Sequence, residues 1–172
     1  MLELKIVITL VAVVYLNKVI LRIAPSRTLL IMGVGMPLGY VAQLLLGREL
    51  NRYNGNVSLN LGYVSLGLVV IWGIGLASIY CLHLWSARRL RIKPNLLLQT
   101  IFAVLLIVVI EFIGSHLLQM KLFDHTRYRA IIPALNIMHA PLWLYGYYWI
   151  VNTVFYYALK AAGIERKILP LK

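Results

Sequence analysis

The chain has 172 residues, of which 62% are hydrophobic and only 13% are charged, whereas typical soluble domains are about 45–50% apolar and about 25% charged. A soluble protein of this length could not bury so much apolar surface, so the composition excludes an ordinary soluble domain and favours a protein embedded in a lipid bilayer. The net charge of +12 comes from lysines and arginines beside apolar segments, where such residues anchor helix ends at lipid headgroups. It therefore predicts membrane lipids rather than nucleic acid as partners, since the sequence has no separate basic face with interleaved aromatic residues.

Five apolar segments follow one another along the chain. They predict an all-α, polytopic membrane bundle of about five transmembrane helices, which forms a single membrane domain over residues 1–172. A helix that rises 1.5 Å per residue needs about 20 residues to cross a hydrocarbon core about 30 Å thick. The expected spans are approximately 6–23, 28–46, 61–85, 96–118 and 132–159.

The first segment is the least secure span, because its uninterrupted apolar part covers only Ile6 to Leu16. It extends to residue 23 if Asn17, Lys18 and Arg22 lie near an interface, where long basic side chains can reach the headgroups. A helix lying in the interface is therefore an open alternative. Pro25 is expected to end this segment.

Small residues and prolines predict local features of the other segments. Gly35 and Gly39 have the small-xxx-small spacing that lets another backbone approach closely, and Pro37 between them is expected to kink the helix. In the last segment, Pro133 and Pro141 are expected to separate the first third from the rest. The third segment offers a further close-packing face through Gly67, Gly73, Gly75 and Ala77.

The distribution of basic residues predicts the orientation. With five crossings, six lysines and arginines lie on the side of the N-terminus and eleven on the other side, which holds the cluster Arg88, Arg89, Arg91 and Lys93. Because connections rich in Lys and Arg stay in the cytoplasm, we expect the N-terminus outside and the C-terminus inside. The expected localisation is an integral, multi-pass membrane protein, in the cytoplasmic (plasma) membrane if the chain is prokaryotic.

Glu111 is the only acidic residue well inside an expected span. A carboxylate at that depth costs several kcal/mol unless it is paired, neutralised or hydrated. His139, in the last segment, is expected at a comparable depth if the two helices are antiparallel neighbours. The simplest way to satisfy both groups is to place Glu111 against His139.

Helical phase adds further side chains to this pair. Thr100 and Ser115 share the face of Glu111 on the fourth segment, and the fifth segment carries a polar and aromatic stripe. That stripe consists of Asn136, His139, Trp143 and Gly146. We expect the two faces to look at each other, so that Ser115, Asn136 and Trp143 contact the substrate. Further polar groups of the substrate site are expected at the outer interface, namely His116, Asp124 and His125.

Three hypotheses for the Glu111–His139 pair remain open. In the first, a buried Glu–His or Glu–Asn pair only fixes the register of the helices. In the second, Glu111 donates or accepts a proton and His139 shares or relays it. In the third, the pair binds a substrate, ion or proton in a transporter or a subunit.

The sequence predicts no metal and no other cofactor. The four histidines form neither an HExxH nor an HxxxH motif, so the histidine boxes of membrane desaturases and hydroxylases are absent. A single cysteine, Cys81, excludes an internal disulfide and a cysteine-based metal cluster.

The favoured function is a small membrane enzyme that carries out acid–base chemistry on a lipid or isoprenoid substrate near the outer leaflet, with Glu111 and His139 as the catalytic residues. The alternative is a non-catalytic subunit, or a substrate-binding or transport component, of a larger membrane complex. The expected partners are membrane lipids and a lipophilic small molecule. For the alternative they also include other membrane subunits or further copies of the chain.

Overall fold

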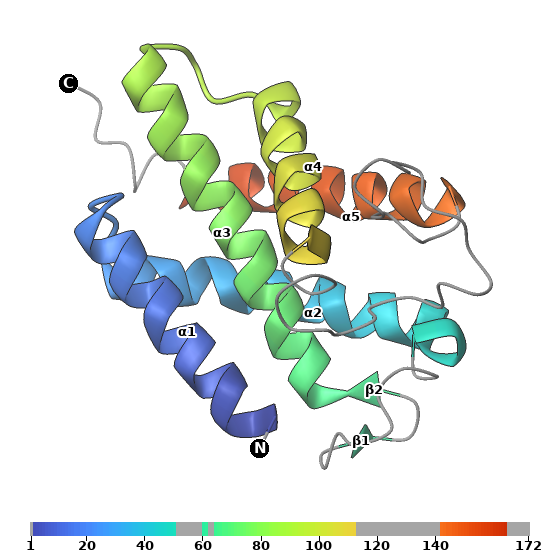
Figure 1. Ribbon diagram of the computed structural model, residues 1–172. Helices are drawn as coiled ribbons and strands as arrows, with labels where there is room; N and C mark the ends of the chain where they lie inside the picture. Colours follow the sequence, from blue (N-terminus) through green and yellow to red (C-terminus); the bar gives the residue numbers. More distant parts are fainter. Residues whose placement is uncertain (1, 51–59, 62–63, 113–141, 165–172) are drawn as a thin grey trace.

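The structure, a computed structural model, describes residues 2–50, 60–61, 64–112 and 142–164. In this part the chain is helical, which confirms the predicted all-α class (Figure 1). Two short strands, β1 (Asn60–Leu61) and β2 (Val64–Ser65), pair antiparallel just before the third helix. The helices of the described residues are α1 (Leu2–Val19), α2 (Pro25–Leu50), α3 (Leu66–Leu90), α4 (Leu96–Phe112) and α5 (Leu142–Ala161).

Capping residues explain where two of the helices begin. Pro25 is the first residue of α2, a position whose amide needs no helical partner and whose fixed φ suits a helix. The expectation that Pro25 ends the preceding helix is therefore wrong, because α1 already ends at Val19. Asn95 precedes α4, and its Oδ1 accepts a 2.9 Å hydrogen bond from the N–H of Leu98, as an N-cap residue does.

The C-terminal end of α3 closes with a left-handed residue. Arg91 has a φ of 55°, and the N–H groups of Arg91 and Ile92 donate hydrogen bonds of 3.2 and 3.0 Å to the carbonyls of Arg88 and Ala87. This is the Schellman pattern that ends many helices. The helix α3 ends at Leu90, beyond the end predicted at residue 85. Its last turn contains Arg88 and Arg89, and the helix dipole favours positive charge at that end.

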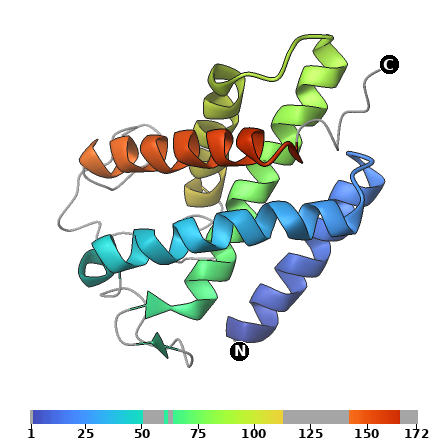
Figure 2. The same cartoon turned by 180° about the vertical axis from the view of Figure 1, so that it is seen from behind.

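The helices form two crossing layers (Figures 1 and 2). One layer contains α1, α3 and α4, with α3 in the middle. The other contains α2 and α5, which lie side by side and cross over the first layer. This arrangement makes α3 the central helix of the described fold, since it contacts all of the other helices.

The contact between α2 and α3 depends on glycines at the crossing. A Cβ atom added to Gly39 would lie 2.5 Å from Cβ of Trp72, and one added to Gly73 would lie 2.7 Å from Cγ of Met36. The predicted close approach at Gly39 is confirmed, and α2 continues as a helix through Pro37. Gly75 has no such neighbour within 4 Å, so the close-packing face predicted for α3 includes Gly73 but not Gly75.

Two helices of the described chain are long and apolar enough to cross a bilayer, over Pro25–Leu45 in α2 and Val69–Leu90 in α3. The apolar parts of α1 and α4, Val7–Val19 and Leu96–Val109, are shorter. Length and apolarity therefore support two of the five predicted spans. The end of the predicted fourth span (113–118) and the start of the fifth (132–141) lie outside the described residues.

Apolar and polar side chains are distributed in an unusual way. Many large apolar side chains face outward, including Leu45 and Leu97, which are 70% and 73% exposed. Several polar side chains lie instead in the interior, and Gln43 and Gln99 have no exposed surface at all. The buried polar residues of the described part are Asn17, Thr28, Gln43, His83, Ser86, Gln99 and Asn152.

Candidate functional site

The structure places two of the residues predicted for the site. Glu111 belongs to the last turn of α4, and Trp143 belongs to the first turn of α5, where its side chain is 54% exposed. The pairing of Glu111 with His139 is not tested and stays a prediction. The other predicted site residues lie outside the described part of the chain: Ser115, His116, Asp124, His125, Asn136 and His139.

A buried cluster of polar side chains joins α4 to α5. Nε2 of Gln99 donates a 2.8 Å hydrogen bond to Oδ1 of Asn152 and a longer one, 3.4 Å, to the backbone carbonyl of Asn152. Nδ2 of Asn152 in turn donates to Oγ1 of Thr100 at 3.4 Å. Thr100 completes the cluster by donating to the carbonyl of Leu96 at 2.9 Å. The cluster therefore satisfies most of its own donors away from water, which is what an apolar environment requires.

The cluster identifies the face of α4 that looks at α5. Thr100 was predicted to share a face with Glu111, and Thr100 does contact α5. Position 111 follows position 100 by about three helical turns, so helix geometry puts the two positions on one side of α4. Thr100 therefore lies on the side of α4 predicted for the site, whereas Gln99 is rotated by about 120° from position 111. Two further residues on the predicted side, Leu97 and Val104, are exposed.

The contacting face of α5 differs from the predicted one. α5 meets α4 through Asn152, whereas the stripe that contains Trp143 and Gly146 is exposed. The same exposed stripe continues along α5 through Ile150 and Val154. In the described residues, the polar side chains of α4 therefore bond to Asn152 of α5, which lies about two turns beyond Trp143 and Gly146.

Sequence reasoning missed Gln99 and Asn152 because it began with Glu111 and His139 and added only residues on the same helical faces as these two. The signal was nonetheless available. Each of the two residues is an amide side chain within a strongly apolar helix, and an amide at membrane depth needs a hydrogen-bond partner just as a carboxylate does.

A second polar group holds the connection between α3 and α4. His83 is fully buried, and its Nε2 accepts a 3.0 Å hydrogen bond from the backbone N–H of Asn95. The hydroxyl of Tyr156, on α5, donates to the carbonyl of Pro94 at 3.4 Å. The His83 ring also lies beside the ring of Tyr156, with 6.0 Å between the ring centroids. This group therefore ties α5 to the α3–α4 connection and has a structural role.

The chemistry available to these two clusters is hydrogen bonding. Among the residues that the structure describes, no three His, Cys, Asp or Glu side chains lie close enough together to hold a metal ion. The amide cluster offers donors and acceptors but no group that titrates near neutral pH. A proton-transfer step therefore needs a group outside the amide cluster, and Glu111, further along α4, is the group that the sequence predicts for it.

Comparisons with models of protein families, with curated proteins and with solved structures find no match for this chain.

Proposed function

We propose that this chain is a multi-pass integral membrane protein that carries out acid–base chemistry on a lipid or isoprenoid substrate, with Glu111 as proton donor or acceptor and His139 as its partner. The observation that carries the membrane part of this proposal is the large number of apolar side chains exposed on the outward faces of the helices. The observation that carries the site is the position of Glu111, a carboxyl residue, within the strongly apolar helix α4.

The outer surface of the described helices supports a membrane location. Apolar side chains cover the outward faces of α1, α2, α4 and α5, and continuous apolar patches of this extent are rare on soluble monomers. Hydrocarbon chains of lipids remove the cost of exposing them. The interior is largely apolar and also holds amides in hydrogen-bonded contact, as is common where helices associate inside a bilayer.

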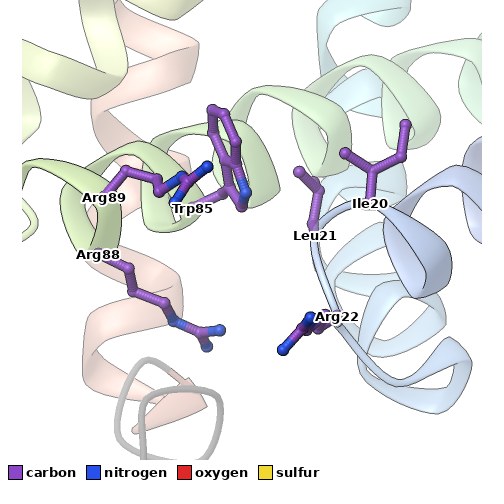
Figure 3. A pocket seen from close by; sticks show the side chains of 6 residues that line it. All are labelled: Ile20, Leu21, Arg22, Trp85, Arg88 and Arg89. Atoms are coloured by element: carbon purple, nitrogen blue, oxygen red, sulfur yellow. The ribbon is translucent and has the colours of Figure 1, made fainter.

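Five spans, with the N-terminus outside and the C-terminus inside, are part of the proposal. Two connections and the end of α5, all expected at the cytoplasmic side, lie close to one another. Arg22, after α1, lines the same pocket as Arg88, at the end of α3 (Figure 3). Tyr156, near the end of α5, contacts Pro94 in the α3–α4 connection. These contacts support a bundle whose basic connections gather at one end, as the positive-inside rule requires.

The site proposal follows from the position of Glu111 on α4. A carboxyl group in an apolar helix is costly and is retained where it has a task. The amide cluster packs α4 against α5, and Glu111 lies about three turns further along the same helix. A carboxyl group held there suits proton transfer to or from a double bond or an ester of a lipophilic molecule that enters from the bilayer.

The test is the Glu111→Gln variant. It keeps the shape of the side chain but replaces the carboxyl group with an amide, which does not take up or release a proton near neutral pH. Purified wild type and variant are incubated with a lipid extract of the source membrane, and the lipids are compared by mass spectrometry. We expect the wild type to change the mass or retention time of one lipid class and the variant to leave that class unchanged. The variant should have the same melting temperature as the wild type. Glu49→Gln, near the end of α2, is the matched control and should retain turnover.

The alternative of a non-catalytic subunit predicts a different outcome. Stoichiometric co-purification of other protein chains, together with no lipid conversion by wild type or variant, would refute the enzyme. Native mass spectrometry of gently extracted protein measures both the bound chains and the bound lipids in one experiment.

A further inference from the structure

One buried histidine holds the connection between α3 and α4 (residues 91–95, Figure 1). His83 lies about two turns before the end of α3 and has no exposed surface. Its Nε2 accepts the 3.0 Å hydrogen bond from the backbone N–H of Asn95. Asn95 is in turn the N-cap of α4, because its Oδ1 accepts the bond from the N–H of Leu98. A single imidazole nitrogen therefore holds the residue that starts the next helix.

This hydrogen bond fixes the protonation state of His83. A ring nitrogen that accepts from a backbone N–H uses its lone pair to do so, so Nε2 carries no hydrogen and the neutral ring has its hydrogen on Nδ1. In the described part of the chain, Nδ1 is buried and has no hydrogen-bond partner. The surroundings of His83 thus offer a donor to one nitrogen and no acceptor to the other.

A positively charged His83 does not fit these surroundings. Both nitrogens of an imidazolium are donors, so an Nε2–H group would point at the N–H of Asn95. Neither nitrogen would then have an acceptor, and a buried charge without partners is strongly destabilising. The ring can therefore take up a second proton only after it has left Asn95.

The neighbours of His83 supply aromatic rings and a cation, which do not offset a positive charge by ion pairing. The rings of Tyr80, on α3, and of Tyr156, on α5, lie beside the imidazole, with 5.8 and 6.0 Å between the ring centroids. Nζ of Lys160 lies 5.9 Å from the centre of the Tyr156 ring on α5. The nearest charge on that helix would therefore repel an imidazolium.

Charged residues of the other elements at this end of the bundle are cations as well. Helix α4 has no charged side chain before Glu111, which is about 24 Å along the helix from position 95. Glu3 and Glu49 belong to the first turn of α1 and the last turn of α2, at the far ends of those helices. The basic residues from the ends of α1 and α3, from the start of α2 and from the α3–α4 connection are Lys18, Arg22, Arg27, Arg88, Arg89, Arg91 and Lys93.

We propose that His83 makes the α3–α4 connection sensitive to acid, because protonation of its ring releases Asn95 and opens the start of α4. The remaining tie from α5 is weak, since the hydroxyl of Tyr156 donates to the carbonyl of Pro94 over 3.4 Å. Opening therefore loosens the start of α4 from α3 and from α5. This device goes beyond the proposed function and is independent of it, since it uses neither Glu111 nor His139.

The direction of the pH dependence follows from where the proton binds. The open form exposes the ring to water, where a histidine has its ordinary pKa of about 6.5, whereas the closed form keeps the ring neutral. The closed form is therefore fully stable above about pH 7 and loses stability as the pH falls below about 6.5. Between pH 7 and pH 5 the equilibrium constant for opening should rise about 20-fold.

The experiment measures amide hydrogen exchange by NMR on the full chain in an uncharged detergent, at pH 7 and at pH 5. Each rate is divided by the intrinsic exchange rate at that pH, so that the resulting protection factor reports opening. We expect the protection of Asn95 and Leu98 to fall about 20-fold in the wild type, while that of Gly39, at the α2–α3 crossing, stays the same. Equal protection of Asn95 and Leu98 at the two pH values would overturn the proposal.

The matched variant is H83Q. Glutamine has an amide oxygen that accepts a hydrogen bond but takes up no proton near neutral pH. We expect H83Q to retain most of the protection of Asn95 at pH 7 and to lose none of it at pH 5. The same loss in H83Q as in the wild type would assign the pH effect to another group and refute the role of His83.

A second measurement tests the proposal if H83Q does not fold. The triple variant H116Q/H125Q/H139Q leaves His83 as the only histidine, so the nitrogen resonances of isotope-labelled histidine report this ring alone. We expect the hydrogen on Nδ1 at pH 7, and an imidazolium at lower pH only where the protection of Asn95 is lost. A hydrogen on Nε2 at pH 7, or an imidazolium while Asn95 is still protected, would refute the proposal.

Discussion

The side chains of Gln99 and Asn152 meet through a 2.8 Å hydrogen bond between α4 and α5, at a position where both residues are buried. The bond joins two helices whose outward faces are apolar. Within the described residues Oε1 of Gln99 has no hydrogen-bond partner, so the cluster can still accept one donor. This leaves an open acceptor in the contact between α4 and α5.

Replacing either amide with leucine should destabilise the fold. Gln99→Leu leaves Asn152 with unpaired polar atoms in an apolar interior, and Asn152→Leu does the same to Gln99. We expect each single change to lower the free energy of unfolding by about 1–2 kcal/mol. The measurement is reversible unfolding in mixed micelles, followed by circular dichroism.

The double variant shows whether the two residues act as a pair. Gln99→Leu with Asn152→Leu removes both polar groups together, so its loss of stability should be smaller than the sum of the single losses. Thr153→Val is the control, because the Thr153 hydroxyl donates only to the carbonyl of Trp149 in its own helix, a bond of little net value. Simple additivity of the two leucine changes would contradict a direct pair.

Glycines at the α2–α3 crossing should respond differently to alanine. Gly39→Ala places a methyl group 2.5 Å from Cβ of Trp72, so the helices must separate, and we expect a loss of about 1–3 kcal/mol. Gly33, on the same helix, has no neighbouring atom within 4 Å. Gly33→Ala should therefore be neutral or stabilising by up to about 1 kcal/mol, since alanine favours the helix. Melting temperatures of the two variants test this contrast, and equal effects would contradict the observed crossing.

The contact of His83 with the cap of α4 gives a third prediction. His83→Leu removes the acceptor of the Asn95 N–H, so the start of α4 should open more easily. We expect hydrogen exchange at Asn95 and Leu98 to accelerate about 10-fold, which corresponds to about 1.4 kcal/mol. Ser78→Ala, which removes only a bond to the carbonyl of Ile74 within α3, should leave these amides unchanged. Unaltered exchange in His83→Leu would show that the histidine does not hold the cap.

Much of the fold could be predicted from hydropathy, because apolar segments of helical length are obvious in a sequence this rich in leucine, isoleucine and valine. Glycine spacing also located the closest crossing, at Gly39. The crossing of the two layers could not be predicted, since it depends on which faces interlock. The rotation of α5 could not be predicted either. The predicted helical phase is counted from Asn136 through Pro141, and a proline can kink a helix, so the phase does not carry over to the residues that follow it.

The candidate site was predictable only in part. Glu111 and Thr100 follow from the apolar character of α4, in which any polar residue stands out. The amide pair needed a different criterion, because Gln99 and Asn152 carry no charge and yet need partners for the same physical reason. The pocket lined by Arg22 and Arg88 could not be predicted, for another reason. Arg22 and Arg88 are far apart in the sequence, and only the fold brings them to one cavity.

Membrane topology can be tested with single cysteines in a Cys81→Ser background. A membrane-impermeant maleimide applied to intact cells should label Asn54→Cys and Leu2→Cys, which are expected outside. It should label Arg27→Cys and Lys93→Cys only after the membrane is opened, because those positions belong to the basic end. The decisive comparison is between positions 2 and 27. Labelling of both from the same side would show that α1 lies in the interface and does not cross, whereas labelling from opposite sides would establish it as a span.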